Sequence, residues 1–288
     1  SALKSLGPCE IWGRDQLGIS EDDPWGWDLS TLRRLNTHSI PKLTHFYAGT
    51  FSRTIEHLKQ RGSKVVYTAA AHNIEASRKA HTDLGLLFDY PHLTDPELWK
   101  RYVGGYLAAD VIICPSRHSE SCMRSYGCKN IVVIPHGCDL PEKTTSLPSR
   151  FIVGNLGAIG PDKGLIYLLQ AWKKLNYKDA TLVFAGRDST SSFMQSLVAQ
   201  YGGGSIELRG WVENVSDFYN SISLYVQSSV SEGFGIEVLE ALSYGRPVVC
   251  STGAVAADIV DGGGLLFNPC DVGHLANQID FFKTSPVT

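Results

Sequence analysis

The sequence lacks several features that would assign it to a specialised class of protein. No apolar run approaches the roughly 20 residues that a helix needs to cross a bilayer. The 26 Lys and Arg residues nearly balance the 29 Asp and Glu residues, so no basic field favours nucleic acid as a partner. No repeat of fixed period and no low-complexity segment is present. The hydrophobic share of 43% is ordinary for a globular protein with a full core.

Cysteine is present, but its pattern favours neither disulfides nor a metal site. The seven cysteines are an odd number and contain no C-x-x-C pair, so their spacing gives a zinc site no support. We expect reduced thiols and a cytoplasmic protein. The basic residues Arg33, Arg34 and Lys42 leave open a peripheral contact with an anionic membrane face, although such clusters are more often simply solvated.

The length of 288 residues predicts two domains of roughly 150 residues each. The stretch "LPEKTTSLPSR" is polar and contains two prolines, which is typical of a linker. We therefore expect an N-terminal domain over residues 1–140, a linker over 141–150 and a C-terminal domain over 151–288.

Short apolar runs alternate with helical patterns on both sides of this linker. In the first part, "KLTHFY", "SKVVYT", "DVIICPS" and "NIVVIPHG" predict strands, and "SRTIEHLKQRG" and "PELWKRYVGGYLAA" predict helices. In the second part, strands are expected at 151–155, 180–185, 205–209, 223–227, 247–250 and 264–267. Helices are expected between them at 163–175, 189–201, 214–221, 235–244, 254–260 and 271–283. This alternation predicts an α/β protein with two Rossmann-like parallel sheets.

The stretch "SSVSEGFGIEVLEALSYGRPVV" joins a predicted strand to a predicted helix. Ligands of open α/β sheets bind beyond the carboxyl ends of strands, and a helix start suits a phosphate. Gly233 and Gly235 would let a ligand approach the backbone, and Glu232 and Glu240 could hold two ends of that ligand through its hydroxyl groups. Alternatively, one glutamate caps the helix and the other is solvated.

A second glycine-rich turn, "GNLGAIGPDKG", also stands between a strand and a helix. Its spacing fits neither a Walker loop nor G-x-G-x-x-G. Lys163 would bring a cation to the same strand ends, where it could neutralise a leaving diphosphate. Alternatively, Lys163 is a surface lysine on the first turn of a helix.

Together these two stretches resemble glycosyltransferase family four, a family of nucleotide-sugar enzymes with the GT-B fold. The motif E-x7-E corresponds to Glu232 and Glu240, and "DKG" matches the lysine motif of the family. Supporting matches are "LAADVIICPS", "IPHGCDL" and "DGGGLLFNPCDVGHLANQI", so that the resemblance covers about residue 64 to residue 283. It implies two Rossmann-like domains that face a cleft.

The resemblance also implies roles for individual residues. Glu240 is expected to bind the ribose hydroxyls, Glu232 the donor sugar, and Lys163 the diphosphate. The base is expected near residues 208–212. The catalytic residues are expected to be Glu232, Lys163 and His72. The substrate-binding residues are expected to be Gly157, Gly160, Arg187, Gly233, Phe234, Gly235, Ile236 and Glu240.

Two of the expected positions have open alternatives. His72 in "AAHN" matches a histidine that the family places near the donor sugar, but it could simply bond the loop backbone. Arg187 could contact phosphate or only solvent. His136 in "IPHGCD" is expected to be structural.

The sequence departs from the family pattern in two places. Ala158 stands where the family usually has an arginine that pairs with the lysine on the diphosphate, so the site has lost a cation unless Arg187 compensates. Residues 1–50 show no glycine-rich loop of the kind that faces the acceptor in the family.

The expected function is metal-independent, retaining transfer of a sugar from a nucleotide-diphosphate sugar, UDP- or GDP-linked, to an acceptor hydroxyl. The acceptor could be a glycan, a lipid or a small molecule, and no cofactor is expected. Two alternatives stay open, namely a non-catalytic nucleotide-sugar-binding subunit and a nucleotide-sugar epimerase on the same scaffold.

Overall fold

The computed structural model describes residues 31, 35, 39–47, 52–69, 74–85, 96–254, 259–260 and 262–285. The chain divides into two compact units. The first unit contains the described residues within Ser1–Ala71, Leu87–Pro115 and Ser119–Ile134, and the second contains those within His72–Leu86, Ser116–His118 and Pro135–Thr288.

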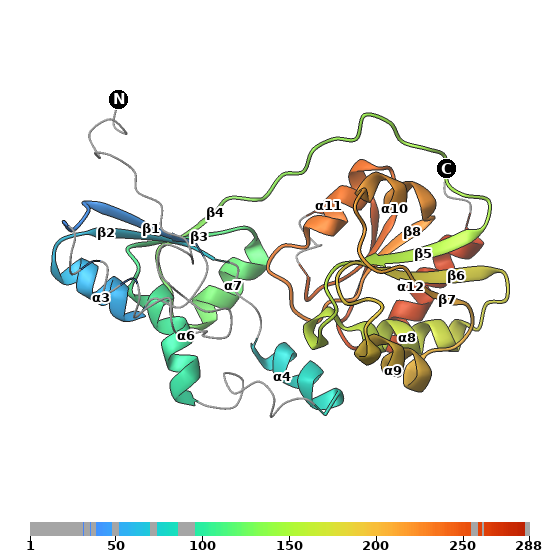
Figure 1. The fold of residues 1–288 in the computed structure, drawn as a ribbon, viewed down its shortest axis with the longest axis horizontal. Helices are drawn as coiled ribbons and strands as arrows, with labels where there is room; N and C mark the ends of the chain where they lie inside the picture. Colours follow the sequence, from blue (N-terminus) through green and yellow to red (C-terminus); the bar gives the residue numbers. More distant parts are fainter. Residues whose placement is uncertain are drawn as a thin grey trace. The chain divides into compact units, whose positions relative to one another are not determined.

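The first unit has a four-stranded parallel sheet in the order β1-β2-β3-β4 (Figure 1). Its strands are β1 (Leu43–Tyr47), β2 (Lys64–Thr68), β3 (Val111–Cys114) and β4 (Ile131–Val133). Its helices are α3 (Ser52–Gln60), α6 (Pro96–Ala108) and most of α7 (Arg117–Ser125). The core forms where Ile55 of α3, Tyr106 of α6 and Met123 of α7 pack with Tyr67 of β2.

The second unit has a six-stranded parallel sheet in the order β10-β9-β8-β5-β6-β7. Its strands are β5 (Phe151–Leu156), β6 (Ala180–Ala185), β7 (Ile206–Leu208), β8 (Leu224–Gln227), β9 (Val248–Ser251) and β10 (Gly264–Phe267). Its helices are α4 (Ile74–Asp83), the 3₁₀ turn η3 (Pro161–Lys163), α8 (Leu165–Leu175), α9 (Ser192–Tyr201), α10 (Val215–Ser221), α11 (Ile236–Ser243) and α12 (Val272–Thr284).

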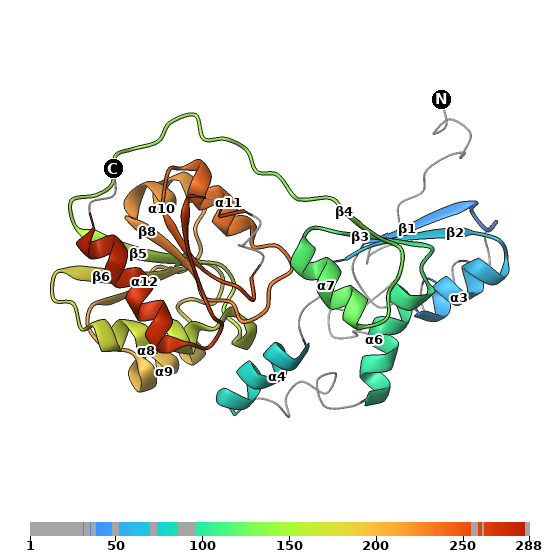
Figure 2. The same cartoon turned by 180° about the vertical axis from the view of Figure 1, so that it is seen from behind.

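Both faces of this sheet are covered by helices, as strand β6 illustrates. Leu182 and Phe184 pack with α8, α9 and α12, whereas Val183 and Ala185 pack with α10 and α11. Successive side chains of a strand point to opposite faces, so this continuous apolar run serves two cores. Figures 1 and 2 show the two groups of helices on opposite sides of the sheet.

The predicted α/β fold with two parallel sheets is confirmed. Each expected strand is present, with ends that differ by a residue or two except in β4, which ends at Val133 and not at Gly137. The helix expected from residue 163 begins instead at Leu165, because Gly164 adopts φ +61° between η3 and α8. Helices α4 and α7 were not predicted, and most of the helix expected at 254–260 lies outside the described residues.

Strand order fixes where a ligand would bind in the second unit. β5 is central, and the chain adds β6 and β7 on one side before it adds β8, β9 and β10 on the other. The order therefore reverses between β5 and β8, and such a switch point leaves a crevice at the carboxyl ends of the two strands. The loops after these strands are residues 157–164 and 228–235, which are the two stretches singled out in the sequence.

No helix in the described part of the chain combines the length and the apolar character that crossing a bilayer requires.

Candidate functional site

The two loops at the switch point are joined by backbone contacts. Val230 N donates a hydrogen bond of 2.8 Å to the carbonyl of Asp162, and the Ser228 hydroxyl donates one of 2.8 Å to the carbonyl of Lys163. A Cβ on Gly164 would lie 2.1 Å from the Ser228 carbonyl oxygen. Only glycine therefore allows the loops to approach so closely, and the approach places Lys163 beside the loop that follows β8.

Lys163 and Glu232 meet in this position and form an ion pair. The Lys163 side chain is 26% exposed and that of Glu232 is 17% exposed, so both are largely shielded but remain reachable from solvent. Ser229 donates a further hydrogen bond of 3.3 Å to the same carboxylate oxygen of Glu232. The structure thus brings together two of the three residues expected to be catalytic.

The charge of Lys163 is stabilised by its surroundings. Burial by itself would lower the pKa of the ammonium group, but the carboxylates of Glu232 and Glu237 outweigh burial, so the pKa of Lys163 is raised. Lys163 is therefore a permanent cation at neutral pH. A fixed positive charge in a partly dry site is suited to a diphosphate.

A series of buried polar side chains, joined by hydrogen bonds, supports Glu232 through Ser229. Gln227 donates to the Ser229 hydroxyl at 3.0 Å, and the Tyr225 hydroxyl lies 2.8 Å from the Gln227 side-chain oxygen, to which it can donate. All three side chains are at least 98% buried, because their exposed fractions are 2% or less. Buried polar groups that are bonded in series hold one another in place, so the carboxylate of Glu232 has a fixed orientation.

Glu240, on the second turn of α11, belongs to a separate hydrogen-bond network. It accepts a hydrogen bond of 2.7 Å from the hydroxyl of Tyr219, whose ring stacks on Tyr244 with centroids 5.2 Å apart. Burial, together with the negative charge of Glu240, raises the pKa of Tyr219 well above its usual range, so this hydroxyl stays a donor. Glu232 and Glu240 are thus held by different partners, as two groups that bind different parts of one ligand would be.

The turns after β5 and β6 each begin with a glycine of positive φ. Gly157 has φ +152° and Gly186 has φ +112°. A Cβ on Gly186 would lie 2.3 Å from the Gly157 carbonyl oxygen, so the turns after β5 and β6 touch directly. Ile159 N donates to the Arg187 carbonyl at 3.3 Å, while the Arg187 side chain is 74% exposed and lies 4.0 Å from Asp188.

The loop at the start of α11 presents backbone rather than side chains. Gly235 has φ +81° and precedes the helix, and no side chain caps the first turn. Phe234 is buried and packs edge-on against His136, with ring centroids 5.0 Å apart. His136 thus contacts this loop through its ring. Ile236, the first residue of α11, is 40% exposed.

Glu237 lies in the same site, and the sequence analysis did not single it out. Its Oε1 atom lies 3.5 Å from the position that a Cβ on Gly157 would occupy. Burial raises the pKa of Glu237, Lys163 opposes this shift, and Glu232 and Glu240 add to it. The signal that could have found it is its place, since Glu237 stands inside the E-x7-E motif on the first turn of α11.

The remaining predicted positions are distributed as follows. Gly160 is extended and precedes η3. His72, the third residue expected to be catalytic, lies outside the described residues. Within the described part of the chain, no group of three His, Cys, Asp or Glu residues is arranged to hold a metal ion.

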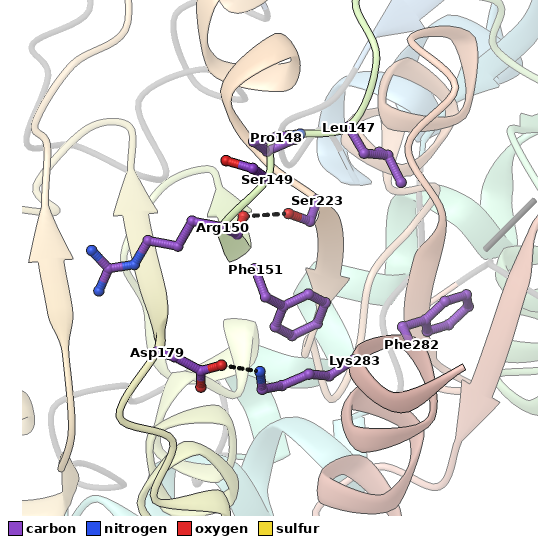
Figure 3. Close-up of a pocket in the computed structure, with 9 residues that line it drawn as sticks. All are labelled: Leu147, Pro148, Ser149, Arg150, Phe151, Asp179, Ser223, Phe282 and Lys283. Atoms are coloured by element: carbon purple, nitrogen blue, oxygen red, sulfur yellow. Dashed lines mark hydrogen bonds and ion pairs between the residues drawn. The ribbon is translucent and has the colours of Figure 1, made fainter. Parts of the chain in front are cut away.

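A cavity of about 530 Å³ lies at the opposite, amino-terminal ends of β5, β6 and β8 (Figure 3). Phe151 lines it, and so do Lys283 and Asp179, which are joined by a hydrogen bond of 2.8 Å from Lys283 Nζ to Asp179 Oδ2. None of the described residues expected to bind substrate is among those that line this cavity, so it is separate from the switch-point site.

Comparison with solved structures decides the type of fold. Sucrose-phosphate synthase from Thermosynechococcus elongatus aligns with a TM-score of 0.72 and 20% sequence identity, over 93% of this chain and 71% of that one. The chain has the GT-B fold. A second GT-B structure, HepE from Anabaena in complex with UDP and glucose, aligns with a TM-score of 0.64 and 20% identity, over 89% of this chain and 72% of that one.

Sequence comparison points the same way for the second unit of this GT-B chain. Residues 150–282 match the family model described as "Glycosyl transferases group 1". The lipopolysaccharide core biosynthesis mannosyltransferase LpcC of Rhizobium leguminosarum bv. viciae is 33% identical over 45% of this chain and 43% of its own length. The O-antigen chain mannosyltransferase B of Escherichia coli is 30% identical over 43% of this chain and 34% of its own length.

The matched region thus spans less than half the length of either curated relative. The predicted resemblance to GT-B glycosyltransferases is confirmed, whereas assignment to family four stays a prediction.

Proposed function

We propose that the protein is a retaining glycosyltransferase of family four that moves a sugar from a nucleotide-diphosphate sugar to an acceptor hydroxyl. The observation that carries the proposal is the meeting of Lys163 and Glu232 at the switch point of the second sheet. A cation for the diphosphate and a carboxylate for sugar hydroxyls are thereby fixed side by side.

The chemistry follows from the groups at this point. Negative charge grows on the diphosphate as the bond to the sugar breaks, and the Lys163 ammonium together with the amides at the start of α11 would stabilise it. Glu232 would accept hydrogen bonds from the donor sugar, and Glu240, bonded to Tyr219, would accept them from the ribose. These roles assign the positive charge of the site to the chain itself, so we propose a reaction without a metal ion.

The relatives support a nucleotide sugar as the donor. HepE has been solved in complex with UDP-glucose, and two relatives are named mannosyltransferases. We therefore propose a UDP- or GDP-linked sugar. The names of those two relatives, which refer to lipopolysaccharide core and O-antigen, favour a glycan acceptor over a lipid or a small molecule.

The first test is donor binding, followed by turnover. A panel of UDP-, GDP- and ADP-sugars should include at least one that raises the melting temperature by mass action. Release of nucleoside diphosphate from that sugar, measured with and without glycan acceptors, then reports transfer.

Replacing Lys163 by alanine should lower this turnover by about 100-fold, as loss of one oxyanion-type donor does. The matched control is Lys173→Ala, which removes an exposed lysine from helix α8 in the same unit. Equal turnover in the wild type and Lys163→Ala would refute the assigned role.

One observation favours a second candidate function. Ala158 leaves residues 157–160 without a cation, and Arg187, the side chain that could compensate, is exposed. A non-catalytic nucleotide-sugar-binding subunit would bind the donor but would release no nucleoside diphosphate with any acceptor. An epimerase would instead isomerise the donor with no acceptor present.

A further inference from the structure

The switch-point site contains more negative charge than a site for a diphosphate needs. Lys163 is its one partly buried cation among the described residues, and it is already paired with Glu232. Glu237 lies beside this pair, and no ion pair joins it to a cation of its own in the described part of the chain. The turn that it faces has the sequence Gly157-Ala158-Ile159-Gly160 and therefore offers no cation either.

The position of Glu237 exposes it to any anion that reaches Lys163. Its Oε1 atom faces Gly157, at 3.5 Å from where a Cβ would stand, so the carboxylate borders the turn. The charged and titratable groups around it come from every neighbouring element. They are Lys163 of η3, Glu232 of the loop after β8, Glu240 of α11, Tyr219 of α10 and Tyr225 of β8, and Asp162 of η3 acts on Lys163.

We infer that Glu237 takes up one proton from solvent when a nucleotide sugar binds, and that it then faces the diphosphate as a neutral hydrogen-bond donor. The inference rests on the proposed function, because it requires a diphosphate beside Lys163. A carboxylate with a dianion brought against it would be repelled, whereas a carboxylic acid can donate to a phosphate oxygen. Glu237 thereby makes donor binding depend on pH.

The direction of this dependence follows from linkage. The pKa of Glu237 is already raised by burial, and the bound diphosphate raises it further. A group that binds protons more tightly in the complex makes the complex more stable as the pH falls. Tyr219 and Tyr225 keep their protons far above neutral pH, and Lys163 stays charged. These three groups therefore do not contribute to proton uptake in this range.

The test is calorimetric titration with UDP-glucose and with GDP-mannose, whose diphosphates carry no group that titrates near neutral pH. Each is titrated from about pH 6 to about pH 8 in buffers of different ionisation enthalpy, which gives the number of protons taken up. For the wild type we expect uptake that approaches one proton and a dissociation constant that rises up to tenfold per pH unit.

Glu237→Gln keeps the shape of the side chain and removes its titration. We expect this variant to bind with no proton uptake, with an affinity independent of pH, and more tightly than the wild type at the upper end of the range. Glu237→Ala should also lose the uptake, and it serves if the glutamine variant melts earlier than the wild type. Glu213→Gln, which replaces an exposed glutamate of the same unit, is the matched control and should behave as the wild type.

Each outcome distinguishes the inference from the proposed function. Binding to the wild type without proton uptake, or uptake that persists in both Glu237 variants, overturns the inference and leaves the proposed function standing. Absence of binding of these two sugars and of every other nucleotide sugar of the panel, to the wild type and to both variants at every pH, overturns the proposed function together with the inference.

Discussion

The substitution Gly164→Ala tests whether the close approach of the two switch-point loops holds the site together. Gly164 has φ +61°, and a Cβ there would lie 2.1 Å from the carbonyl oxygen of Ser228. Both obstacles concern backbone, so no side chain can rotate away to make room. The loop that carries Lys163 must therefore move away from the loop that follows β8.

The cost can be worked out from the contacts that are lost. Alanine in the left-handed region costs about 1–2 kcal/mol. The hydrogen bonds from Val230 N to Asp162 and from the Ser228 hydroxyl to Lys163 contribute about 1 kcal/mol each. We expect a loss of about 3–4 kcal/mol in the free energy of unfolding, which is a large fraction of the stability of an ordinary domain. Donor binding should fall in parallel, because Lys163 and Glu232 no longer meet.

The assay is urea unfolding followed by circular dichroism, with the thermal shift by the best donor as a second measurement. Gly160→Ala is the matched control for stability. Gly160 belongs to the same loop, its backbone is extended, and a Cβ there meets nothing within 4 Å. A Gly164→Ala protein as stable as the Gly160→Ala protein would show that the loops do not depend on this approach, and the reasoning would fail.

Two further predictions concern other parts of the described chain. Tyr219→Phe removes the hydroxyl that donates to Glu240. Donor affinity measured by calorimetry should therefore fall by about tenfold, consistent with the loss of a hydrogen bond to a charged group of about 1.5 kcal/mol. An unchanged affinity would show that Glu240 does not take part in donor binding. The backbone amide of Val65 donates a hydrogen bond to Asp110, and this bond, with smaller contributions from the charges of Lys59 and Lys64, holds the pKa of Asp110 below its ordinary value of 3.8. The carboxylate therefore stabilises the first unit above that pH, and the stabilisation is lost as the pH falls below it. Asp110→Asn should therefore unfold at lower urea concentration than the wild type at pH 7, with the difference shrinking towards pH 3, and a difference independent of pH would contradict the assignment.

The strands of the second sheet were predictable because their pattern is local. The run "ATLVFA" of β6 is apolar except for Thr181 and every residue in it is buried, as a strand covered on both faces requires. Helices α4 and α7 were missed because their sequences, "IEASRKAHTD" and "RHSESCMRS", have few apolar residues. Their buried positions include Ser119 and His81, which do not contribute to an apolar periodicity.

The place of the two glycine-rich turns at strand ends was predictable, but their contacts were not. Glycines and a lysine at strand ends indicated a phosphate site, since the chemistry of such turns is local. The pairing of Lys163 with Glu232 joins residues 69 positions apart and depends on strand order, which hydrophobic periodicity does not specify. Glu237 could not be assigned for a related reason, because only the folded structure places it against Gly157.

The ion pair between Lys163 and Glu232 means that the site carries its own counter-ion. Inorganic phosphate or sulfate would have to displace a carboxylate to reach the ammonium group, and would leave that carboxylate without a cation. A molecule that carries both a phosphate and a neighbouring hydroxyl compensates both partners at once. The pair would therefore weaken the binding of small anions, which are abundant in any cell, because a negative charge alone compensates Lys163 but not Glu232.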